Sequence, residues 1–127
     1  VGLGSFRARG RDARRIADLH SMQNALELYF SKNGIYPDMT VNSASEWGVM
    51  ASTLKSAGIG VANIPSDPAA AAGKFYRYGP SPDGLSYVLA AVLEDSSNPV
   101  LREDVDDSSY GVSCDDTATE ANYCIQF

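Results

Sequence analysis

Apolar residues recur every three or four positions between about Asp12 and Lys32, which is the spacing of one face of an α-helix. They are Ile16, Leu19, Met22, Leu26, Tyr29 and Phe30. Neither proline nor glycine interrupts this stretch, and Gly34 supplies the expected stop because glycine adopts a left-handed conformation easily. The pattern predicts a helix about 30 Å long. No other segment is long enough to be an equal helical partner, so a sheet is expected to cover its apolar stripe.

The middle of the chain predicts a connection with one shorter helix. This helix is expected over 44–56, and its inner face would carry Trp47, Met50, Ala51 and Leu54. Residues 64–68 (IPSDP) predict a rigid turn, because each proline fixes its own φ and restricts the residue before it. Residues 69–73 are small and are expected to form a loop.

The last third of the chain has the composition of β-structure. Short strands are expected at 75–78 and 123–127, and a near-continuous apolar run at 86–94 predicts a central strand. Residues 79–84 predict a turn and residues 95–107 an acidic loop. Together these elements predict an α+β fold class, with a long N-terminal helix packed on a small antiparallel sheet.

Length and composition favour one domain spanning residues 1–127, divided into a helical stem (1–33), a connection (34–74) and a sheet with a C-terminal loop (75–127). A chain of 127 residues, 44% of them hydrophobic, can bury a core unaided. No run approaches the roughly 18 apolar residues that a membrane-spanning helix needs. The net charge of −6 argues against nucleic-acid binding by the whole surface.

The charges are unevenly distributed. Residues 1–20 carry five arginines and two aspartates, whereas residues 94–120 carry nine acids and one arginine. Opposite charge at two ends lets copies attract one another head to tail; two solvated faces without a partner are the alternative. The basic run 7–15 is expected to be a solvated helix face rather than a site for DNA or anionic lipid.

The N-terminus begins Val1-Gly2-Leu3-Gly4, without methionine, and then turns basic. We expect it to be the tail of a longer apolar segment; a tag remnant and a plain N-terminal arm are the alternatives.

Two cysteines, Cys114 and Cys124, lie near the C-terminus. Two cysteines without a nearby histidine do not complete a four-ligand zinc site, so a disulfide closing a short loop is expected. Such a bond implies an oxidising compartment. A pair of free thiols in a cytosolic protein is the alternative.

The acidic stretch offers oxygen ligands of the kind that calcium prefers, at Asp104, Asp106 and Asp107. Its spacing copies no strict motif, and a solvated acidic loop is the alternative. Catalysis finds little support, because no Gly-x-Ser-x-Gly nucleophile motif or phosphate-binding loop occurs. The single histidine, His20, is expected to be structural. We therefore expect no enzyme, no catalytic residue and no cofactor other than this calcium.

Six segments occur in a characteristic order along the chain: 13–19 (ARRIADL), 23–29 (QNALELY), 33–37 (NGIYP), 64–68 (IPSDP), 76–78 (YRY) and 87–89 (YVL). In this ordered set the chain resembles type IV pilins and type II secretion pseudopilins. The cysteine pair is similar to the disulfide-bounded C-terminal loop of many type IV pilins. The family's peptidase site and apolar N-terminal helix half would both precede Val1.

The resemblance implies a structural subunit of an extracellular filament. An apolar N-terminal helix would hold the subunit in the membrane before assembly and pack in the filament core afterwards. Its partners would be copies of itself and other pilin subunits. Arg11, Arg14 and Arg15 lie mostly off the apolar stripe and are expected to face neighbouring subunits. A pseudopilus subunit is the alternative within the same class. The other alternative is a secreted ligand-binding or adhesin module, or a minor pilin that recognises a ligand.

Overall fold

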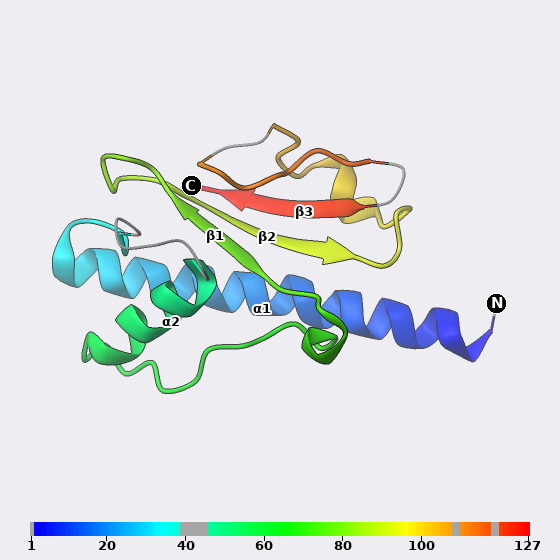
Figure 1. Cartoon of the computed structure of the whole chain (residues 1–127), viewed down its shortest axis with the longest axis horizontal. Helices are drawn as coiled ribbons and strands as arrows, with labels where there is room; N and C mark the ends of the chain where they lie inside the picture. Colours follow the sequence, from blue (N-terminus) through cyan, green and yellow to red (C-terminus); the bar gives the residue numbers. More distant parts are fainter. Residues whose placement is uncertain (1, 39–45, 108–109, 118–119) are drawn as a thin grey trace.

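The computed structural model describes residues 2–38, 46–107, 110–117 and 120–127. Helix α1 (Leu3–Asn33) runs along the whole molecule, and a small antiparallel sheet lies along one side of it, as Figure 1 shows. Helix α2 (Glu46–Ser56) packs beside α1 and against the first strand. The predicted α+β class, with one long helix on a small sheet, is confirmed.

Helix α1 is nine residues longer at its N-terminus than the apolar pattern predicts. Its first residues do not continue the core-facing stripe, and Gly4 and Gly10 are poor helix formers. Proline is absent from these first residues, so the packed helix can continue through this segment. The C-terminus ends as expected: Gly34 has φ +74°, and its N–H donates to the carbonyl of Phe30 at 2.7 Å.

The sheet contains β1 (Arg77–Pro80), β2 (Tyr87–Leu93) and β3 (Ala121–Gln126), in the order β1-β2-β3. Both pairs are antiparallel, and the central position of the apolar strand is confirmed. Successive side chains of β2 point to opposite faces of the sheet, and both faces are covered. Strand β2 is therefore apolar throughout. Tyr87, Leu89, Ala91 and Leu93 belong to the main core with α1 and α2, whereas Val88 and Ala90 pack with Val112 and the two cysteines.

Several boundaries differ from those predicted. Strand β1 begins two residues later than expected and includes Gly79, which has the appearance of a turn residue in the sequence. A Cβ at Gly79 would lie 2.5 Å from the carbonyl oxygen of Tyr110, so the close approach of that backbone requires glycine. Short 3₁₀ helices, η1 (Ala70–Ala72) and η2 (Pro99–Arg102), occur where loops were expected. Of the predicted shorter helix, residues 44–45 lie outside the described part of the chain.

The predicted disulfide is present and joins Cys114 to Cys124. It ties the segment before β3 to the face of the sheet that points away from α1. Across the described ranges, no helix combines the length and the apolar character that a membrane crossing requires.

Candidate functional site

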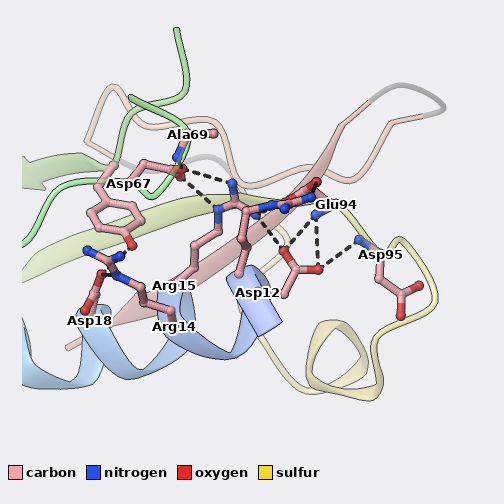
Figure 2. Close-up of polar contacts among 10 residues, drawn as sticks. Asp12, Arg14, Arg15, Asp18, Asp67, Ala69, Glu94 and Asp95 are labelled. Atoms are coloured by element: carbon pink, nitrogen blue, oxygen red, sulfur yellow. Dashed lines mark hydrogen bonds and ion pairs between the residues drawn. The ribbon is translucent and has the colours of Figure 1, made fainter. Parts of the chain in front are cut away.

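A buried cluster of charged side chains fixes α1 to the rest of the fold. Arg15 lies on the inner face of α1, and its side chain is 0% exposed. Its Nε and Nη2 each donate to one carboxylate oxygen of Asp67 at 2.9 Å, which is the two-bond geometry that suits a guanidinium. Asp67 also accepts the backbone N–H of Ala69 at 2.8 Å, so the turn before η1 is held in place (Figure 2).

The other side of the Arg15 guanidinium contacts two further carboxylates. Its Nη1 donates to Asp12 at 2.8 Å and to Glu94 at 2.7 Å. Asp12 is fully buried and accepts the backbone N–H groups of Glu94 and Asp95, each at 2.9 Å. The cluster therefore joins α1, the turn at Asp67 and the end of β2.

Arg11 forms the outer layer of this cluster. It donates to both oxygens of Glu94, at 2.6 and 2.7 Å. Hydrogen bonds from Arg11, and then from Arg15, together lower the pKa of Glu94 to about 2, against the opposing effect of burial. Burial alone would lower the pKa of Arg15, but hydrogen bonds to Asp67, Glu94 and Asp12 outweigh it and raise that pKa.

The chemistry of this cluster is structural. Every ionised group in its interior has a partner of opposite charge, so removing one partner leaves others buried and uncompensated, at a cost of about 3–5 kcal/mol. No atom of Arg15 remains exposed to contact a ligand. The cluster can set the position of α1 relative to the sheet, at the point where the helix leaves the fold.

The structure corrects part of the predicted assembly surface. Arg15 was expected to face neighbouring subunits, and this is wrong, because its position on α1 turns it inward to three carboxylates. Arg11 is partly exposed and is paired with Glu94. Of the three arginines, Arg14 remains largely free for a partner: its side chain is 60% exposed, and its Nε lies 3.7 Å from Asp18.

The predicted calcium ligands are not brought together by the described part of the chain, in which no group of three or more His, Cys, Asp and Glu side chains could hold a metal ion. Asp104 accepts the backbone N–H of Cys124 at 3.0 Å, and burial raises its pKa. Asp106 and Asp107 are exposed. Because residues 108–109 lie outside the described ranges, calcium binding at this loop stays a prediction.

The sequence did not single out Asp12, Asp67 or Glu94. One signal was available, since Asp12 and Arg15 are three residues apart and so share a helix face. Asp67 and Glu94 lie 52 and 79 residues from Arg15. The chain contains many acidic residues, and the sequence alone does not show which distant one pairs with Arg15. Comparison of the chain with known protein families, with curated proteins and with solved structures found no match.

Proposed function

We propose that this chain is the head of a filament subunit, of the kind that type IV pilins and pseudopilins represent, and that α1 makes the contacts that polymerise it. The observation that carries the proposal is that α1 extends past its own fold. Residues 3–10 continue the helix beyond the sheet, as the blue end in Figure 1 shows, and Leu3 and Phe6 are 66% and 65% exposed. Large apolar side chains on a projecting helix favour a partner helix or head.

The outer face of α1 supports the same proposal. The face opposite the core is exposed, and most of its residues are small or apolar, with Asn24 as a polar exception: Leu3, Phe6, Gly10, Ala13, Ala17, Ser21 and Leu28. Most of them recur at three- and four-residue intervals, so they form one stripe along the helix. Small side chains let a second helix approach closely, because the distance between packed helices depends on the residues at the contact.

The buried cluster around Arg15 gives the helix a fixed direction. A subunit that polymerises through α1 needs its head held at one angle to that helix, since with a variable angle successive copies could not form the same contacts. Paired, fully buried charges have one good geometry and penalise others. This cluster lies where the projection begins, which is where such a constraint acts most directly.

The contact proposed between copies joins unlike surfaces. A heterologous contact that does not close makes a helical fibre. An apolar segment preceding Val1 would hold the subunit in the membrane before assembly, and the filament would lie outside the cell, where the Cys114–Cys124 bond is stable. In this function the chain is not an enzyme.

The experiment is to label the chain in its native host and to examine sheared surface material by immunogold electron microscopy. The proposal expects gold along filaments that disappear when the gene is deleted and return with the wild-type gene. Filaments that extend from the wild-type cell indicate a pilus, and filaments confined to the cell envelope indicate a pseudopilus. Dispersed chain with no labelled filament would contradict the proposal, and the secreted binding module would replace it.

A further inference from the structure

A surface cavity of about 350 Å³ lies between α1 and the C-terminal edge strand of the sheet. His20 and Gln23 of α1 form one wall, and Tyr123 and Ile125 of β3 form another. The rest of the lining comes from the segment around η2 and from β3: Val100, Glu103, Asp104, Val105, Cys124 and Gln126. The cavity is therefore partly apolar and large enough for one aromatic side chain.

The charge of this cavity has one sign. Glu103 and Asp104 line it, and neither lysine nor arginine does. One oxygen of Asp104, Oδ2, accepts the N–H of Cys124, whereas the buried Oδ1 has no hydrogen-bond partner in the described part of the chain. Asp106, two residues further along, is exposed. A partly apolar cavity whose lining includes the exposed carboxylate of Glu103 suits an aromatic or aliphatic side chain next to a guanidinium.

The projecting end of α1 carries that combination. Leu3 is a surface neighbour of both Phe6 and Arg7, which lie three and four residues after it and point to either side of it. Residues 3–10 contain no acid, and Arg7 makes no ion pair within the described ranges of the chain. The projection and the cavity are thus complementary in charge and in apolar character.

The projecting end of α1 cannot reach the cavity of its own chain. Phe6 and His20 lie on one continuous helix, and 14 residues separate them, or about 21 Å at 1.5 Å per residue. A continuous helix does not fold back on itself. The occupant must therefore come from another molecule, and the chain itself displays a suitable one.

We infer that the projecting end of α1 in one copy docks into the cavity between α1 and β3 of a second copy, with Phe6 in the cavity and Arg7 beside Glu103 and Asp104. This inference rests on the proposed function, which it deepens by naming the two surfaces. The contact is heterologous: each copy has one projection and one cavity, so the docking repeats from copy to copy.

A charge exchange tests the contact on the folded chain in solution. Arg7→Glu and Glu103→Arg should each weaken self-association by about fivefold, the size of effect that an exposed ion pair produces. The measurement is sedimentation velocity at near-millimolar protein and low salt. An equimolar mixture of the two variants should associate more strongly than either alone, because the Arg7→Glu projection then pairs with the Glu103→Arg cavity, and the unchanged projection of one variant with the unchanged cavity of the other. Lys55→Glu, on exposed α2, is the control and should change nothing.

Crosslinking locates the contact. Gly10→Cys continues the face of Phe6, and a Cβ at this position meets no atom within 4 Å. Gln126→Cys lies at the cavity. A short bismaleimide should join these two cysteines between copies, both in concentrated solution and in isolated filaments. A chain with Gly10→Cys and Lys55→Cys should form no such product.

The two proposals fail in different ways. Labelled filaments in which Gly10→Cys and Gln126→Cys do not crosslink would overturn the docking inference and leave the filament proposal standing. A mixture of charge-exchanged variants that associates no better than either alone would also overturn the docking inference. Absence of any filament containing the chain in its host would instead contradict the proposed function.

Discussion

The projecting and packed parts of α1 share one backbone geometry but differ in environment. Residues 3–10 extend beyond the sheet, and Leu3 and Phe6 there are exposed. From Asp12 onward the inner face of the helix is buried against the sheet. An isolated helix shorter than about 12–15 residues is marginal in water. The projection is therefore helical because it continues a packed helix, and the buried charges at Asp12 and Arg15 mark the boundary between the two parts.

The largest expected effect comes from removing the charge at that boundary. Arg15→Ala leaves Asp12 and Asp67 buried without their cation, and should lower the free energy of unfolding by about 3–5 kcal/mol. Arg15→Lys should fall between wild type and Arg15→Ala, because an ammonium cannot make the paired bonds to Asp67. Arg14→Ala is the exposed control and should change stability by less than about 0.5 kcal/mol. Urea denaturation measures all three, and an unchanged midpoint for Arg15→Ala would show that the cluster does not hold the fold.

Two matched proline substitutions test the difference between the parts directly. Ala17→Pro breaks α1 within its packed length and should cost about 3 kcal/mol or more. Ala8→Pro breaks it in the projection and should cost less than about 0.5 kcal/mol, while removing some helical circular dichroism. Equal destabilisation by the two variants would mean that the projection is packed in the isolated chain.

The C-terminal segment on the other face of the sheet is held by a covalent bond. Cys114→Ser should lower the free energy of unfolding by about 2–3 kcal/mol, because it releases a short closed loop. The circular dichroism of α1 should persist, since that helix packs on the opposite face. Thiol titration of the unfolded, unreduced wild-type protein should find no free thiol; two titratable thiols would contradict the bond.

A smaller effect is expected from acid. The folded-state pKa of Glu94 is about 2, against an ordinary value of 4.5, so its stabilising contribution is complete above pH 4.5 and is lost as pH falls toward 2. Glu94→Gln should flatten the decline of stability over this window relative to wild type. Glu103→Gln, at an exposed position, is the control and should leave the decline as it is. Parallel pH profiles for all three proteins would show that Glu94 makes no such contribution.

Local sequence patterns were sufficient to predict the packed part of α1 from its apolar periodicity, the central strand from its apolar run, and the disulfide from an isolated pair of cysteines. They missed the projecting part, since residues 3–11 do not continue the core-facing stripe and their helical state depends on the packed helix that they extend. They placed β1 too early, because Gly79 and Pro80 resemble a turn until the backbone of Tyr110 is seen beside Gly79. These patterns placed Arg15 on the surface, because two of its three carboxylate partners are distant in the sequence and only the fold brings them close to it.

The measurement that tests the central claim most directly is a filament count for two matched alanine variants in the native host. Ala17 lies on the exposed outer face of α1, and Ala71 is an exposed alanine in η1. If the outer face of α1 makes the contacts between copies, Ala17→Arg should reduce filament number by about fivefold or more, as overpacking a helix interface costs about 1 kcal/mol or more. Ala71→Arg should leave the number unchanged, and both soluble heads should melt like wild type. Wild-type filament numbers for Ala17→Arg, or equal losses for both variants, would contradict assembly through α1.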